Sequence, residues 1–235
     1  MIASQMIKNK VVIKIIGLFI GLAVSLSSLN GQGREYIRAQ IEQKGECRNV
    51  AITKTNGDLM LFGLNGYATF GCPHSLTSSM EELYNDKAYI DDIQLTEEGR
   101  WLILYDKKGL LWNDIPYSLE VKLLEFYDKN EVITAVTFND LNDWIVITTK
   151  YFTSSNGDIT NWLKEGSEKY GPLLTASITD NTMVAVFTQG IRYSGNVPQS
   201  LLEALEKTKL NVFRLKIAGS SWFFADEEGN YEYIM

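Results

Sequence analysis

One order of predicted elements recurs along this chain at a nearly constant interval: strand, strand, short third strand, helix. The interval is visible at the start of the second strand, where Trp101 and Trp144 are 43 residues apart. Met183 follows Trp144 by 39 residues, and Trp222 follows Met183 by 39. A repeat of roughly 42 residues restricts the fold to an array of similar units that pack on one another.

The unit between residues 90 and 130 shows the pattern most clearly. Residues 90–95 alternate apolar and polar side chains, which predicts a half-buried strand. Residues 101–105 (WLILY) are rich in strand-forming types, and residues 110–112 predict a short third strand. Pro116 then opens a predicted helix, because proline suits the first helical turn. The apolar face of this helix contains Leu119, Leu123 and Phe126.

The same order fits the rest of the chain. First strands are predicted at 50–53, 133–138, 174–178 and 213–217, second strands at 59–62, 144–148, 183–187 and 222–225, and third strands at 66–70, 190–193 and 230–234. Further helices are predicted after Pro73, through Trp162 and after Pro198.

The two ends of the repeat array complement each other. The last unit ends in strands without a helix, whereas residues 36–43 predict a lone helix before the first strand. We therefore predict an α+β fold: a closed propeller-like ring of about five strand-strand-helix repeats of ~42 residues. In this ring the N-terminal helix completes the C-terminal blade. Closure also removes exposed sheet edges.

The first 32 residues predict a signal peptide. Lys8, Lys10 and Lys14 precede the apolar run Ile15–Leu26, and small residues follow it. An uncleaved membrane anchor is the alternative. Residues 33–235 then form a single repeat domain. We expect an exported protein, periplasmic or extracellular, that meets a membrane only if the N-terminal segment stays uncleaved.

The charge of the chain excludes some partners. The formal net charge is −7, and it falls to −10 once the three lysines of the N-terminal segment are removed. Nucleic-acid binding depends mostly on neutralising phosphates, so this acidic chain predicts no nucleic-acid partner. Adsorption to anionic membranes is disfavoured for the same reason.

The cysteines and acidic residues give only weak indications of chemistry. Cys47 and Cys72 form either a disulfide or two separate buried thiols. Cys72 and His74 flank Pro73 at a helix start, where the thiol pKa would fall, but side chains on either side of a proline usually diverge. Acidic pairs such as Asp91–Asp92 and Glu97–Glu98 fall in or beside turns and are interpreted as turn residues. No catalytic residue, metal site or cofactor is predicted.

Aromatic residues recur at two positions of the unit. The tryptophans that open second strands are interpreted as packing residues. The aromatics of the third strands are the predicted binding residues, because on a shared rim their rings would stack on sugars or peptide side chains. These residues are Phe70, Trp112, Phe152, Tyr193 and Tyr231. The alternative is that they fill gaps beneath the helices.

Over residues 47–235 the chain resembles exported bacterial tandem-repeat proteins whose units carry Trp, Gly and Ile-Pro at fixed places. The best unit matches these places with Gly99, Trp101, Gly109, Ile115 and Pro116. The fourth unit has Met183 in place of Trp, and the third carries Asp158 instead of Pro. The resemblance implies a repeat architecture. In outline the ring is also similar to the pentein fold of guanidine-modifying enzymes, but no catalytic motif of that family fits this sequence.

The repeat and the absence of catalytic motifs favour a non-catalytic exported binding or interaction module. Its expected ligand is a glycan or an envelope protein. The alternative is an envelope hydrolase or a thiol enzyme with a site at the centre of the ring.

Overall fold

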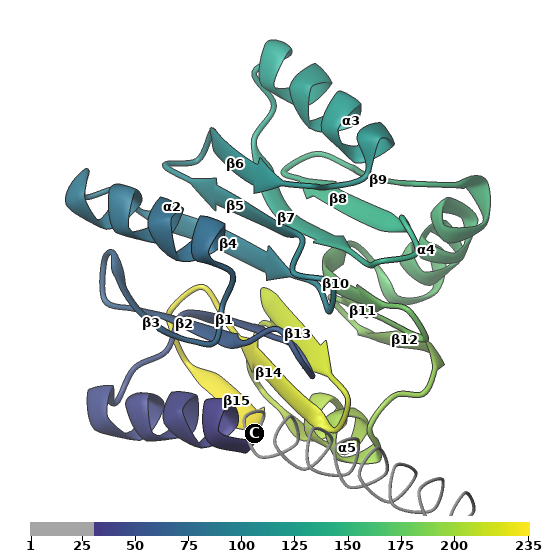
Figure 1. Ribbon diagram of the computed structural model, residues 1–235. Helices are drawn as coiled ribbons and strands as arrows, with labels where there is room; N and C mark the ends of the chain where they lie inside the picture. The colour runs from purple at the N-terminus through teal and green to yellow at the C-terminus, as the bar shows by residue number, and fades with distance from the viewer. Residues whose placement is uncertain (1–30) are drawn as a thin grey trace, which may run out of the picture.

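A computed structural model describes residues 31–235 and shows an α+β protein of five three-stranded antiparallel sheets (Figure 1). Apart from its last two residues, the predicted signal peptide lies outside the described part of the chain. The sheets are β1 (Asn49–Ile52), β2 (Asp58–Phe62) and β3 (Gly66–Phe70); β4 (Ile90–Leu95), β5 (Trp101–Tyr105) and β6 (Gly109–Asn113); β7 (Ile133–Phe138), β8 (Trp144–Thr148) and β9 (Phe152–Ser154); β10 (Leu173–Thr179), β11 (Thr182–Phe187) and β12 (Gly190–Gly195); and β13 (Arg214–Ala218), β14 (Ser221–Ala225) and β15 (Tyr231–Ile234).

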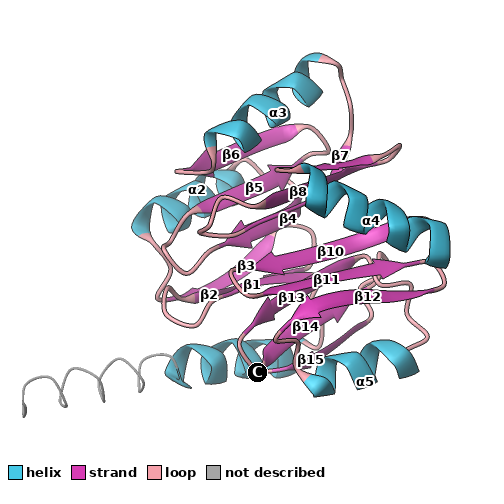
Figure 2. Ribbon diagram, turned by 90° about the vertical axis from the view of Figure 1, so that its right-hand side faces the viewer, coloured by secondary structure: helices cyan, strands magenta, loops and turns pink. Residues whose placement is uncertain are grey.

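A helix follows each of the first four sheets. These helices are α2 (His74–Asn85), α3 (Tyr117–Asp128), α4 (Gly157–Tyr170) and α5 (Gln199–Lys207). Each sheet with the helix that follows it forms one unit, numbered one to five along the chain. A further helix covers residues 31–44 before the first sheet and is called the N-terminal helix. It begins before the predicted residue 36. The helices lie on the outside and the strands inside (Figure 2).

The predicted repeat of strands and helices is confirmed. Every sheet is an antiparallel meander in which the second strand is central. The first strands of units two, three and four also share an irregularity that the sequence did not indicate. Their pairing register shifts by one residue near the start, at residues 91, 134 and 174. Such a bulge increases the local twist of a strand.

The helices begin in two ways. Proline occupies the N-cap of α2, α3 and α5, and none of these helices has a side-chain cap. In α4 the N-cap is Asn156, whose side chain accepts a hydrogen bond of 2.9 Å from the Ile159 amide. Asn156, and not Asp158 as expected, therefore takes the place of proline at the start of α4, and it satisfies an otherwise unpaired amide.

Each helix fills the space between two successive sheets, and this interface is called a junction. The core around α3 contains Leu119 and Leu123 of the helix, Leu104 of unit two and Val146 of unit three. All four side chains are almost completely buried. Because the helix needs both sheets to cover its apolar face, a single unit could not form a stable core.

The N-terminal helix fills the junction between the last sheet and the first. Ile37 and Ile41 pack with Met60 of β2 and Phe223 of β14. Met235 packs against the same core, and the C-terminus lies beside this helix in both views (Figures 1 and 2). The N-terminal helix therefore contacts both the first and the last unit.

The first strands of the five units lie innermost and contact one another in succession. β1 contacts β4, β4 contacts β7, β7 contacts β10, and β10 contacts β13. β13 in turn contacts β1. The second and third strands lie progressively further out.

Three junctions share one hydrogen bond. The indole Nε1 of the tryptophan that opens a second strand donates to the serine at the second position of the preceding helix. The pairs are Trp101–Ser75 (3.0 Å), Trp144–Ser118 (2.9 Å) and Trp222–Ser200 (3.0 Å). Each tryptophan is only 3% exposed. The bond satisfies the one polar atom of a buried indole.

The other two junctions replace both partners together. At the junction between units three and four, Met183 stands in place of Trp, and Asp158 stands in place of Ser. At the last-to-first junction, Asp58 holds the tryptophan position, since it pairs with Ile52 as Trp101 pairs with Leu95. The Asp58 carboxylate binds Arg34 of the N-terminal helix at 2.7 Å.

Within residues 31–235, no helix combines the length and the apolar character needed to cross a lipid bilayer.

Candidate functional site

The inner edges of the first strands have no neighbouring strand to pair with. Side chains from other units bind these backbone groups instead. Lys216 donates to the carbonyl of Ile93 (2.7 Å), and the Thr137 hydroxyl accepts from the amide of Ile178 (3.0 Å). This explains why polar side chains point toward the centre of the molecule, since buried backbone groups need partners.

Four of these side chains form a buried charged group between the first strands, called the axial cluster: Asn49, Asp92, Arg214 and Lys216. Asp92 Oδ1 accepts from Lys216 Nζ (2.9 Å) and from Asn49 Nδ2 (2.7 Å). Arg214 Nε lies 4.0 Å from the same oxygen. Burial alone would raise the pKa of Asp92, but the two cations outweigh it and hold that pKa below its ordinary value. Burial in turn lowers the pKa of Lys216 and of Arg214, and Asp92 opposes that lowering in both.

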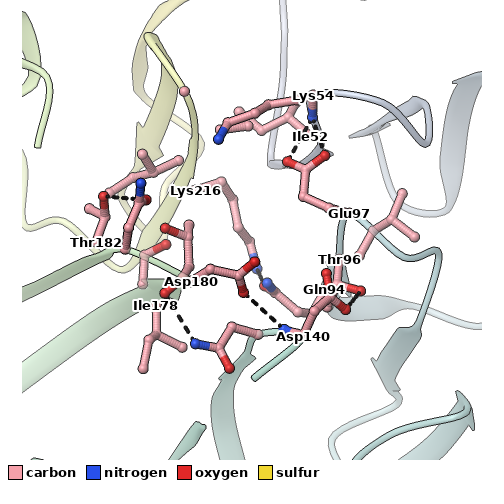
Figure 3. Close-up of a pocket in the computed structure, with 18 of the residues that line it drawn as sticks. Ile52, Lys54, Gln94, Thr96, Glu97, Asp140, Ile178, Asp180, Thr182 and Lys216 are labelled. Atoms are coloured by element: carbon pink, nitrogen blue, oxygen red, sulfur yellow. Dashed lines mark hydrogen bonds between the residues drawn. The ribbon is translucent and has the colours of Figure 1, made fainter. Parts of the chain in front are cut away.

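Two hollows lie at opposite ends of the first strands, separated by the axial cluster. The larger, of about 620 Å³, is lined at the beginnings of the strands by Arg48, Tyr89 and Arg214, among others. The second, of about 390 Å³, lies at their far ends and is called the axial cavity (Figure 3). All five units contribute residues to the axial cavity, whereas unit four contributes none to the larger hollow.

The floor of the axial cavity is formed by equivalent residues of four first strands. In each unit, one first-strand residue pairs with the second-strand residue at the tryptophan position, as Leu95 pairs with Trp101. The floor residues come one position before that paired residue, and they are Ala51, Gln94, Ser177 and Lys216. The Lys216 ammonium binds Asp92, the Ile93 carbonyl and Gln94 Oε1, so its three protons are directed into the protein. Its charge lies beneath the cavity floor.

The walls of the axial cavity are the turns between first and second strands. Their carboxylates bind the turn of the preceding unit. Glu97 accepts from the amide of Lys54 (2.8 Å), and Asp140 accepts from the amide of Glu98 (3.1 Å). Asp180 accepts from the amide of Asp140 (3.2 Å). The sequence predicts only a role in turn geometry for Glu97 and Asp140; in the structure both also connect successive units, and so does Asp180.

The predicted aromatic residues all lie on third strands, which are the outermost strands, and none lines the axial cavity. Trp112, Phe152 and Tyr231 pack against the cores of neighbouring helices, as the alternative interpretation expects. Phe70 lies 5.7 Å from the ring of Tyr36, and Tyr193 is 51% exposed.

These aromatics also occupy three register levels. Phe70 pairs with the second-strand residue at the tryptophan position itself. Trp112 and Tyr193 pair with the second-strand residue one further along. Phe152 and Tyr231 pair with the second-strand residue three further along. The structure therefore does not place the five rings in one row. Their role in binding stays a prediction.

The two cysteines are separate thiols. Cys47 donates to the carbonyl of Asn49 (3.6 Å), and Cys72 donates to the carbonyl of Asp58 (3.3 Å). Burial raises the pKa of Cys72 to about 12, which is the opposite of the lowering expected at a helix start. His74 instead hydrogen-bonds Ser78 through Nδ1 (2.8 Å). Cys72 is therefore protonated at neutral pH and supplies no thiolate nucleophile.

In the described part of the chain, no three His, Cys, Asp or Glu residues come together as metal ligands. A comparison of the chain with protein-family models, with curated proteins and with solved structures finds no match.

Proposed function

We propose that this protein is a non-catalytic exported binding module, built as a closed propeller-like ring, whose ligand occupies the axial cavity. The observation that carries this proposal is a cavity of about 390 Å³ to which all five units contribute. Its volume falls in the range of small-molecule sites, roughly 300–1,000 Å³. A site made by all five units depends on their assembly, and no unit could form it alone.

Two contacts support the closed ring. β13 contacts β1, and the N-terminal helix packs between the last sheet and the first. Deleting residues 34–46 should therefore lower the unfolding free energy of the whole domain. Denaturant unfolding followed by tryptophan fluorescence measures this, because Trp222 lies in the last unit. An unchanged cooperative transition after the deletion would contradict the closed ring.

The lining of the axial cavity favours a polar ligand. Hydroxyl, amide and carboxylate groups dominate it, including Thr182, Asn181 and Asn196, and Phe138 is its one aromatic residue among those described. Convergent groups of this kind recognise molecules with several hydrogen-bonding groups. A saccharide of the cell envelope meets this requirement. The predicted export of the chain and its resemblance to exported tandem-repeat proteins agree with such a ligand.

Isothermal titration of the purified protein with neutral saccharides, amino saccharides and peptidoglycan fragments tests the proposal. Asn181→Ala changes the cavity wall, and Tyr193→Ala changes an exposed third-strand aromatic. Binding that weakens only in Asn181→Ala supports the axial cavity. Binding that weakens only in Tyr193→Ala would instead favour the outer-strand aromatics, and no binding to any probe would contradict a saccharide ligand.

A further inference from the structure

The five turns around the axial cavity differ at one equivalent position. In each unit it comes two residues after the first-strand residue that pairs with the tryptophan position of the second strand. In unit two, for example, Leu95 pairs with Trp101, and the position is Glu97. Its occupants, from unit one to unit five, are Lys54, Glu97, Asp140, Asp180 and Gly219. Units two, three and four thus carry a carboxylate there, and each carboxylate binds the turn of the preceding unit. Units five and one carry none.

This difference leaves two neighbouring turns without a carboxylate partner. By the repeat pattern, a carboxylate from unit five would accept from the amide of Asp180, and one from unit one would accept from the amide of Gly219. Among the described residues, neither amide donates a hydrogen bond within the protein. Asp180 and Gly219 both line the axial cavity.

A cation lies across the position where the series is broken. A Cβ atom added at Gly219 would lie 3.4 Å from Lys54 Cε, so the lysine side chain runs directly over this turn. Figure 3 shows Lys54 extending from its own turn across the top of the cavity. The Lys54 side chain therefore runs beside the turn of unit five, where a carboxylate is missing.

The charge beneath the cavity has the same sign. This charge belongs to Lys216, which binds Asp92 at 2.9 Å; Arg214 lies 4.0 Å from Asp92, faces Asp91 and Glu227 as well, and lines the hollow at the other end. Lys216 lines the cavity floor. Glu97, Asp140 and Asp180 also line the cavity, and Glu97 is bound to the turn that carries Lys54. The cavity is thus positive on its floor and at the broken turn, and negative along the remaining turns.

From this arrangement, and resting on the proposed function, we propose that the ligand of the axial cavity is a small hydroxy- or amino-carboxylate. Its carboxylate occupies the place of the missing turn carboxylates, accepts from the amides of Asp180 and Gly219, and pairs with Lys54. Its hydroxyl or ammonium groups face the acidic wall. Sugar acids and amino acids both belong to this class.

Matched ligand pairs test the proposal by isothermal titration with the full chain. The pairs are D-glucuronate against D-glucose, and L-alanine against L-alaninamide. The carboxylate member of at least one pair should bind about tenfold more tightly, since hydrogen bonds to charged groups are the strong ones. This preference should shrink in Lys54→Gln. It should persist in Lys207→Gln, which removes an exposed lysine of α5 far from the cavity.

Gly219→Asp provides a second test, because it supplies the missing carboxylate from the protein. Gly219 has a φ of 61°, a conformation that Asp and Asn tolerate better than other residues. Gly219→Asn is the uncharged control of equal size. Binding of the carboxylate ligand should be lost in Gly219→Asp and retained more strongly in Gly219→Asn.

The outcomes separate this inference from the proposed function. Neutral saccharides that bind the cavity with no preference for a carboxylate would overturn the inference and leave the binding module standing. A carboxylate preference that is unchanged in both Lys54→Gln and Gly219→Asp would also overturn it. No binding of any of the four probes would contradict the carboxylate ligand and remove support from the axial cavity as a site.

Discussion

Two junctions hold a helix against a sheet by different kinds of contact: the junction between units two and three, and the last-to-first junction. At the first, Trp144 donates to Ser118 across a buried apolar interface. At the second, a carboxylate and a guanidinium, Asp58 and Arg34, meet at 2.7 Å. Covalent connection brings successive units together, whereas the last-to-first contact joins distant parts of the chain. Here the protein uses a pair found at none of the other four junctions of residues 31–235.

The difference suggests that the ion pair provides specificity. A Trp–Ser contact is repeated at three junctions, so it cannot distinguish one junction from another. Arg34 would lose its partner against any other sheet, because the equivalent positions there are Trp or Met. An unpaired buried charge is costly, which penalises incorrect assembly. We expect the ion pair to define which sheet the N-terminal helix joins, and the predictions below test that comparison.

The largest effect should come from Trp144→Ala. The substitution leaves a cavity between two sheets, and it should lower the unfolding free energy by about 3–5 kcal/mol. Chemical denaturation measures the loss. Met183→Ala, at the same position of a junction without the serine, is the control and should cost less because Met183 is only half-buried. Equal losses in the two variants would show that the tryptophan junctions are not special.

Asp58→Ala should have the next largest effect, about 3 kcal/mol at neutral pH, because Arg34 then remains buried without its carboxylate. Arg34→Ala is the matched single variant, and the double variant completes the cycle. We expect the double variant to lose clearly less than the sum of the two single losses. Additive losses would mean that the two side chains act independently, and the last-to-first junction would then rest on apolar packing alone.

Ser118→Ala should cost about 1 kcal/mol, since it removes the acceptor of the Trp144 indole N–H, in a part-buried bond. Ser78→Ala, which alters a partly exposed helical serine bound to His74, should change the unfolding free energy by less, because it leaves no tryptophan N–H without its acceptor. If Ser118→Ala lowers the unfolding free energy no more than this control does, the Trp–Ser hydrogen bond does not stabilise the junction.

A pH dependence of stability should arise at the last-to-first junction. Burial raises the pKa of Asp58 from 3.8 to about 6, and Arg34 only partly offsets it. The folded state therefore holds this proton more tightly than the unfolded state, so the resulting stability is present below about pH 4 and is lost as pH rises toward 6. The unfolding free energy of the wild type should fall relative to Asp58→Asn over this range. A difference that is flat from pH 4 to 6 would refute the raised pKa.

Much of the fold could be predicted because short, recurring residue patterns mark its strands and helix starts. The spacing of Trp101, Trp144 and Trp222 indicated the units, and the prolines before α2, α3 and α5 indicated the helix starts. One signal was present but not used: a serine follows each of these prolines by two residues, at Ser75, Ser118 and Ser200. Read together with the tryptophans, this Pro-x-Ser pattern would have predicted the hydrogen bond across three junctions.

The candidate site was harder to predict because its residues are ordinary turn residues. Asp140 and Asp180 belong to different units, and only the packing of first strands brings their turns together. Lys216 and Asp92 are 124 positions apart in the chain. We predicted aromatic residues as the binding residues instead, because aromatic rings are common at binding surfaces. In the structure these rings lie on the third strands, which are the outermost.

The sequence by itself determined the number of units, their element order and the apolar faces of their helices, because periodicity and capping act within a few residues. The tertiary structure alone decided that β13 meets β1, that Asp58 meets Arg34, and that five turns surround one cavity. Those contacts depend on how each unit is rotated and displaced relative to the one before it, added over five units. Local sequence preferences do not specify this rotation and displacement, which are fixed only when all five cores pack together.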